Sequence, residues 1–155
     1  MTTLSAIYDA FLSKITDDMY LELTKEDTEG MMYDLFRGAL PWFEFPRFDM
    51  FSYSEEEKAY SFDLTHEEIN IIATYMVTEW IGQQLATIEL TRMKYSGSDF
   101  KFTSQANHMH KLIALRKEYE RAGLHLQRLY KRRKIDKNGK VKSTFGSIMT
   151  TSFKE

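Results

Sequence analysis

Residues 64–94 read LTHEEINIIATYMVTEWIGQQLATIELTRMK and carry a complete helix signature. Thr65 and Glu68 form a capping box: the Thr65 hydroxyl accepts from the backbone N–H of Glu68, and the Glu68 carboxylate accepts from the backbone N–H of Thr65. Apolar residues then recur at helical spacing, at Ile69, Ile72, Ala73, Met76, Trp80 and Ile88. The spacing predicts a helix that runs from this box to about Lys94.

A second long helix is expected after the break at residues 96–98, Ser-Gly-Ser. Thr103 or Ser104 would cap this helix, and it would end near Arg133. Its residues along one face would be Ala106, Met109, Leu112, Ile113, Arg116, Leu124 and Leu129. Gly123 is a weak point, because glycine in an exposed helix interior costs about 1 kcal/mol relative to alanine. Two long helices joined by a short loop predict an antiparallel helix hairpin.

Two shorter helices are expected upstream. The first has apolar residues three and four apart behind a cap at Thr3 or Ser5: Leu4, Ile7, Tyr8, Phe11, Leu12, Ile15 and Met19. The second would run from about Thr28 to Phe36 or Ala39, with Gly38 and Pro41 as its stop.

Residues 41–64, PWFEFPRFDMFSYSEEEKAYSFDL, differ from these helices because they hold both prolines and eight aromatic residues. Alternating residues predict a short β-hairpin whose turn spans Ser54 to Lys58: Phe48, Met50, Phe51 and Tyr53, then Tyr60 and Phe62. The three glutamates 55–57 would be a solvated turn. The surplus aromatic residues would pack the core or anchor an interface.

The C-terminal segment is different again. Asn138-Gly139 between Ile135 and Val141 indicates a type I′ hairpin, and the residues beyond it are polar with isolated apolar side chains. The predicted fold is therefore mainly α: a small helical bundle with a long antiparallel helix hairpin, a short β-hairpin insertion and an extended C-terminal tail. We expect a helical domain over residues 1–134 and a hairpin and tail over 135–155 that a partner orders.

Composition and missing motifs argue against several function classes. The chain has 155 residues, 43% of them hydrophobic, and it contains no cysteine, so disulfides and thiolate metal sites are excluded. No apolar run approaches the roughly 20 residues that span a bilayer, which predicts a soluble protein.

His108 and His110 lie two apart, a spacing that points them away from each other on a helix. No nucleophile elbow or phosphate-binding loop occurs, so we expect no enzyme, cofactor or metal.

Charge is distributed unevenly along the chain. Residues 1–90 carry 18 acidic and 5 basic side chains, whereas residues 91–155 carry 5 acidic and 16 basic ones. This polarity suits head-to-tail contact between neighbours or a basic end that meets phosphate; alternatively, folding mixes the two halves on one surface. The predicted partner-binding residues are Arg128, Lys131, Arg132, Arg133 and Lys134 in the basic cluster and Phe145, Ile148, Met149 and Phe153 in the tail.

Three readings of the basic cluster remain open. It could bind a protein partner or complement the dipole of the preceding helix, form a solvated face, or bind nucleic acid. The pI of about 6.1 lies well below that of a dedicated nucleic-acid-binding domain. The alternative function is a helical nucleic-acid-binding or regulatory protein that uses the basic helix over residues 111–134.

Residues 64–81, LTHEEINIIATYMVTEWI, and 90–119, LTRMKYSGSDFKFTSQANHMHKLIALRKEY, resemble small virion proteins of tailed bacteriophages, the head-to-tail connector (adaptor or head-completion) proteins. The most distinctive part is DFKFTSQANH at 99–108, preceded by Glu79-Trp80. The resemblance implies a helical-bundle subunit made in the host cytoplasm and placed in the virion neck. It also implies a homo-oligomeric ring of about twelve copies, a portal protein and a tail or second neck protein as partners, and packaged DNA nearby.

Overall fold

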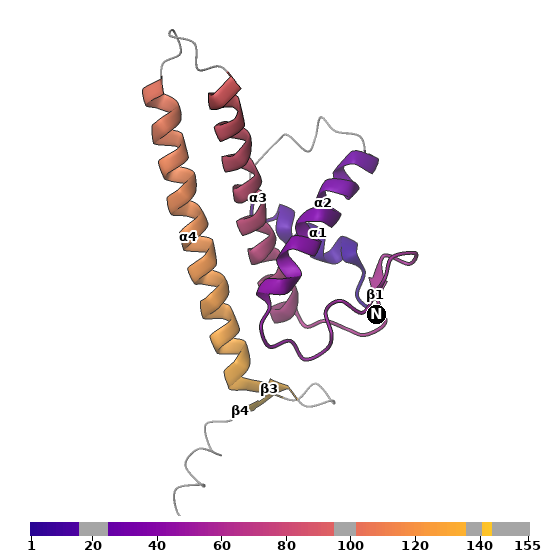
Figure 1. Ribbon diagram of the computed structural model, residues 1–155. Helices are drawn as coiled ribbons and strands as arrows, with labels where there is room; N and C mark the ends of the chain where they lie inside the picture. Colours follow the sequence, from indigo (N-terminus) through magenta and orange to yellow (C-terminus); the bar gives the residue numbers. More distant parts are fainter. Residues whose placement is uncertain (16–24, 95–101, 136–140, 144–155) are drawn as a thin grey trace, which may run out of the picture.

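The computed structural model describes residues 1–15, 25–94, 102–135 and 141–143, and for 25–26, 91–94, 102–106, 133–135 and 141–143 it describes the backbone only. The fold is mainly helical, as predicted (Figure 1). Its helices are α1 (Leu4–Leu12), α2 (Lys25–Ala39), the 3-10 helix η2 (Leu40–Trp42), α3 (His66–Lys94) and α4 (Phe102–Arg132). Two antiparallel β-hairpins complete it: β1 (Tyr53–Ser54) with β2 (Ala59–Tyr60), and β3 (Arg133–Ile135) with β4 (Val141–Ser143).

The predicted helix hairpin is formed by α3 and α4, which run side by side in opposite directions (Figure 1). The capping box at the start of α3 is confirmed, since the Glu68 N–H donates to Thr65 Oγ1 at 3.3 Å and the Thr65 N–H donates to Glu68 Oε2 at 2.7 Å. The predicted caps of α4 are wrong, because the helix begins at Phe102 and both Thr103 and Ser104 lie within its first turn.

The upstream helices differ from the predictions at their ends. α1 ends at Leu12, where the Ser13 hydroxyl donates to the backbone oxygen of Ala10. Thr3 is the residue before α1, but its side chain forms no capping hydrogen bond; its backbone forms a β-bridge with Ala59. α2 begins at Lys25, three residues before the predicted start, and ends at Ala39; Pro41 then sits in η2. Proline has no N–H to donate and favours this early position in a helix.

The β1–β2 hairpin is shorter than predicted. Tyr53 pairs with Tyr60 and Ser54 with Ala59, so Ser54 belongs to β1 and not to the turn that was predicted to begin there. Phe48, Met50, Phe51 and Phe62 lie outside the strands. The reason is local: a carboxylate oxygen of Asp49 accepts the backbone N–H of Phe51 at 3.0 Å, and its carbonyl accepts that of Ser52. An aspartate that bonds the backbone two residues on forms a turn, which competes with strand pairing.

The second hairpin is confirmed where it is described. Ile135 pairs with Val141, while residues 136–140, which include Asn138-Gly139, lie outside the described residues. The extended tail beyond Ser143 lies outside them too. No helix in the described ranges is long and apolar enough to cross a membrane.

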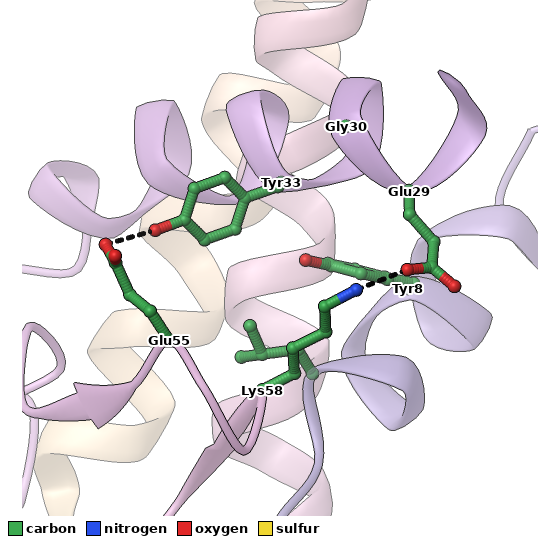
Figure 2. A pocket seen from close by; sticks show the side chains of 7 residues that line it. Tyr8, Glu29, Gly30, Tyr33, Glu55 and Lys58 are labelled. Atoms are coloured by element: carbon green, nitrogen blue, oxygen red, sulfur yellow. Dashed lines mark hydrogen bonds and ion pairs between the residues drawn. The ribbon is translucent and has the colours of Figure 1, made fainter. Parts of the chain in front are cut away.

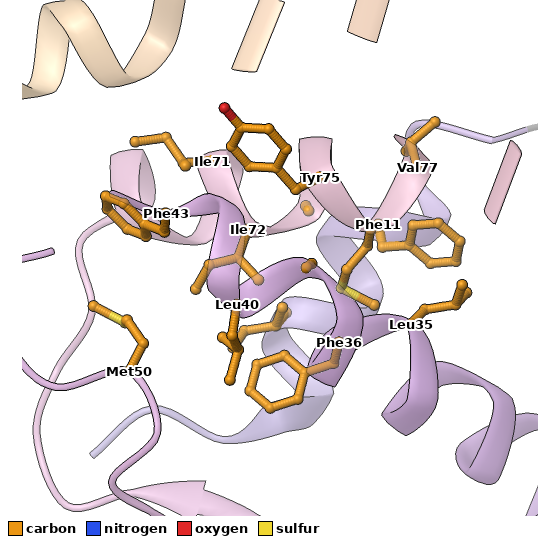
Figure 3. Close-up of a cluster of buried hydrophobic side chains, with 14 of the residues drawn as sticks. Phe11, Leu35, Phe36, Leu40, Phe43, Met50, Ile71, Ile72, Tyr75 and Val77 are labelled. Carbon is orange, nitrogen blue, oxygen red and sulfur yellow. The ribbon is translucent and has the colours of Figure 1, made fainter. Parts of the chain in front are cut away.

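The core surrounds the first half of α3. All eight residues from Ile71 to Thr78 are buried, so this part of α3 is enclosed rather than amphipathic as the spacing predicted. Figure 1 shows the cause: α4 covers one side of α3, and α1 and α2 cover the other. Figure 3 shows side chains from α1, α2 and α3 meeting around Phe36 and Ile72, with Tyr75 pointing out of the cluster toward α4.

Gly123 is not an exposed weak point, which corrects the prediction from helix propensity. It is buried in α4, and a Cβ built on it would lie 2.6 Å from Cζ of the Tyr75 ring. A real Cβ does not approach a ring that closely, so the ring can fill this space only when residue 123 has no side chain. The glycine therefore sets how closely α3 and α4 pack.

Candidate functional site

The C-terminal end of α4 presents three of the predicted partner-binding residues on the surface: Arg128, Lys131 and Arg132 are all exposed. The buried side chains of Gln127 and Tyr130 alternate with them and face inward. One turn earlier, Leu124 is 44% exposed. Residues four apart share a helix face, so Leu124, Arg128 and Arg132 form an outward stripe.

Gln127 attaches this end of α4 to α3 and to the segment after η2. Its side-chain amide donates to the Trp42 carbonyl at 2.8 Å and to the Tyr75 hydroxyl at 2.6 Å, and its oxygen accepts the Glu44 N–H at 2.8 Å. Three hydrogen bonds on one buried amide fix its position, because each group would otherwise be buried without a partner. The backbone of α4 that carries the exposed cations Arg128, Lys131 and Arg132 is thereby held in place.

A second buried network lies around Glu68, whose side chain is fully buried. Glu68 accepts from the Tyr130 hydroxyl at 2.7 Å and from Nη2 of Arg47 at 3.2 Å, in addition to the Thr65 N–H. Burial, and then the hydrogen bond to Glu68, raises the pKa of Tyr130 above its usual value. The carboxylate is satisfied on all sides, so its role is to join α3, α4 and the Arg47 loop.

The loop over residues 42–51 divides its apolar residues between core and surface. Phe43 and Met50 are buried, and Phe51, at 62%, is the most exposed of four residues that face solvent: Trp42, Phe45, Phe48 and Phe51. Both sequence readings of the aromatic surplus therefore have residues that fit them. Exposed aromatic groups that cluster on a surface are typical of interaction sites.

This loop adjoins the basic end of α4. Lys131 Nζ lies 3.9 Å from the centroid of the Phe45 ring, a cation–π contact. Trp42 stacks on Tyr75 with centroids 5.8 Å apart, and its indole N–H donates to Glu79. We call Trp42, Phe45, Arg128, Lys131 and Arg132 the basic–aromatic surface.

The structure describes the remaining predicted partner-binding residues only in part. The backbones of Arg133 and Lys134 lie in β3, opposite Ser143 and Lys142, and their side chains are outside the described part of the chain. The predicted tail residues also lie outside it: Phe145, Ile148, Met149 and Phe153. The structure thus brings together only the helical members of the predicted set, and it adds two aromatic residues to them.

A second surface feature was missed by sequence reasoning. Two adjoining hollows, of about 420 and 620 Å³, lie between α1, α2 and the β1–β2 turn. They share Leu4, Tyr8, Glu29 and Lys58 as lining residues. Their charged members are four acids and one base: Asp9, Glu29, Glu55, Glu57 and Lys58. We call the pair the acidic hollow. Its residues come from three separate elements, so no local pattern could have indicated it.

Figure 2 shows how a cation is held within the acidic hollow. Lys58 has a left-handed backbone, with φ of 48°, and its ammonium lies 2.5 Å from Glu29 Oε2. Facing this pair, the Tyr33 hydroxyl donates to Glu55 at 2.7 Å. Burial, followed by the nearby Glu29 charge, raises the pKa of Tyr8 to about 12. The raised pKa means that folding favours the neutral phenol of Tyr8.

The histidines do not gather. His66, His108, His110 and His125 are each exposed, and nowhere in the described ranges do three metal-ligating side chains come together.

The chain matches no protein-family model, and neither the curated proteins nor the solved structures include one with significant similarity to it.

Proposed function

We propose that this chain is a structural subunit of the neck of a tailed bacteriophage, where an adaptor ring joins the portal to the tail. The observation that carries the proposal is the basic–aromatic surface, in which exposed aromatic rings and exposed cations adjoin at the fixed end of a long helix hairpin. Aromatic residues and arginine are the types that dominate binding energy at protein interfaces. The resemblance of residues 64–81 and 90–119 to connector proteins supplies the class of assembly.

The organisation of the surface supports a binding role over a purely structural one. Buried Gln127 and Tyr130 fix the end of α4, and the cation–π contact holds Lys131 against the Phe45 ring before a partner arrives. Preorganised side chains lose little conformational entropy on binding. The portal protein, or a tail or second neck protein, is the proposed partner of the part of this surface that Trp42, Phe45 and Lys131 form.

The direct test is recovery of the tagged protein from its native source. Portal and tail proteins identified by mass spectrometry, together with ring-containing particles in negative-stain electron microscopy, would support the neck role. A doubly substituted chain, Phe45→Ser with Lys131→Ser, should fold but fail to enter particles. The matched control is Leu90→Ser, which removes an equally exposed apolar side chain near the far end of α3. Normal incorporation of the double variant would remove this surface from the proposal.

One observation favours the nucleic-acid alternative: several cations are exposed along α4, namely Lys111, Lys117, Arg121, Arg128, Lys131 and Arg132. Acids interrupt the row, since Glu118 is exposed and Glu120 lies 3.5 Å from Arg116. Binding of DNA or RNA that weakens steeply with salt would favour the alternative. Its loss on reversal of Lys117 and Arg121 to glutamate would locate that site on α4.

A further inference from the structure

The two strongly charged surfaces lie on opposite sides of the molecule. The acidic hollow is built from α1, α2 and the β1–β2 turn, and the stripe of Leu124, Arg128 and Arg132 lies on α4. Figure 1 shows α3 between these elements. Folding therefore keeps the acidic hollow and the basic stripe apart. Opposite charges that are kept apart within one chain are available for contact between chains.

The acidic hollow has the chemistry to receive a long cationic side chain. Its walls combine apolar Leu4, Leu12 and Met32 with an excess of carboxylates, and its volume is in the range of ligand-binding clefts. Lys58 already shows how an ammonium is bound there, against Glu29 and beside Tyr8 (Figure 2).

The stripe on α4 is a chemical complement to these walls. Exposed Leu124 lies one turn before Arg128 and two turns before Arg132, and both arginines are exposed. An arginine can bind a carboxylate through two parallel hydrogen bonds. Leu124 would contact apolar residues of the hollow such as Leu12, which is 36% exposed.

Symmetry decides how two copies would meet. A face-to-face contact of either surface with itself would bring like charges together, which is unfavourable. Contact between the hollow of one copy and the stripe of the next joins opposite charges and leaves one surface of each kind unused at the two ends. Such a heterologous contact repeats and can close into a ring.

We propose that the acidic hollow of one copy binds the Leu124–Arg128–Arg132 stripe of a second copy of this chain, head to tail. The inference rests on the proposed function in taking the subunit as ring-forming, and it specifies which surfaces meet. Lys58 remains on Glu29, and the incoming arginines meet Glu55, Glu57 and Asp9.

The test uses two variants of the full chain, each blocked on one surface. The hollow variant carries Glu55→Lys with Glu57→Lys, and the stripe variant carries Arg128→Gln with Arg132→Gln. All four residues are exposed, so the fold should persist, which circular dichroism checks. The control pairs Asp34→Lys with Glu118→Gln, at exposed positions that line neither surface.

Sedimentation velocity is the readout, at low and at high ionic strength. Wild type and control should self-associate at low salt and dissociate as the Debye length falls from about 30 Å to about 3 Å. Each blocked variant alone should associate at least tenfold more weakly. Mixed together, the two should form a one-to-one dimer and nothing longer, because only the stripe of the first and the hollow of the second remain intact.

Each other outcome overturns the contact. A wild type that stays monomeric, blocked variants that associate like wild type, or a mixture that forms long species would each rule it out. These results are separable from the neck role. A chain that enters particles but does not self-associate through these surfaces removes the contact alone, whereas one that self-associates as described but is absent from particles removes the neck role alone.

Discussion

Gly123 of α4 packs directly against the phenol ring of Tyr75 on α3, so closely that a Cβ on residue 123 would lie 2.6 Å from Cζ of that ring. The hydroxyl of the same ring accepts a hydrogen bond from Gln127, one turn further along α4. Tyr75 therefore sets the distance between α3 and α4 at Gly123. It also holds Gln127, which fixes the basic end of α4.

Gly123→Ala should destabilise the protein, although alanine favours a helix by about 1 kcal/mol over glycine. The added methyl group forces the Tyr75 ring to move, and overpacking of this kind costs about 1–3 kcal/mol. Urea-induced unfolding measures the difference. Gly30→Ala in α2 is the control: no atom lies within 4 Å of a Cβ there, so it should be neutral or stabilising. A stabilised Gly123→Ala variant would contradict the close approach.

Glu68→Gln should cost about 1–3 kcal/mol of unfolding free energy. The amide retains the shape of the carboxylate but loses the charge that the buried side chain offers to Arg47, Tyr130 and the Thr65 N–H. Thermal or urea unfolding reports the loss. Glu118→Gln, at an exposed position on α4, should change stability by less than about 0.5 kcal/mol. Equal stabilities of the two variants would show that the Glu68 network contributes little.

Stability should fall in alkaline solution, in part through Tyr8. Its pKa is raised from 10.0 to about 12 in the folded protein, so folding favours the neutral phenol. That contribution is fully present below the unfolded pKa of 10 and is lost as the pH rises toward 12. Tyr8→Phe has no phenol proton to lose, so its unfolding free energy should decline less steeply over this window. Parallel curves for variant and wild type would refute the role of Tyr8.

Substitutions of aromatic residues in the 42–51 loop should lower stability according to how deeply each ring is buried. Phe43 is 5% exposed and contacts Tyr130 edge to face, so Phe43→Ala should cost about 3–5 kcal/mol. Phe51 is 62% exposed, so Phe51→Ser should change stability by less than about 0.5 kcal/mol. Urea unfolding compares the two. A large loss for Phe51→Ser would mean that this ring packs into the fold rather than serving as an exposed surface.

Local sequence signals were reliable where the interaction is itself local. The Thr65–Glu68 capping box and the extent of α3 were both predicted from residues close together in the chain. The same reasoning failed where a competing contact won. Asp49, for example, forms a turn where strand alternation was expected.

The candidate surfaces show the same division. Exposed cations at the end of α4 could be predicted, because a charged run beside a helix end rarely becomes buried. The acidic hollow could not, since Tyr8, Glu29 and Glu55 are brought together by elements that are far apart in the sequence.

By itself, the sequence determined that this is a mainly helical protein with a long helix hairpin and oppositely charged halves, because periodicity, caps and net charge are properties of the chain. Only the tertiary structure decided which faces are covered. The other helices enclose α3 from both sides, and the close approach of Tyr75 requires glycine at position 123. The acidic hollow lies on the opposite side of α3 from the basic stripe. These outcomes depend on which elements pack together, and packing is fixed by the combined shape and burial of distant residues.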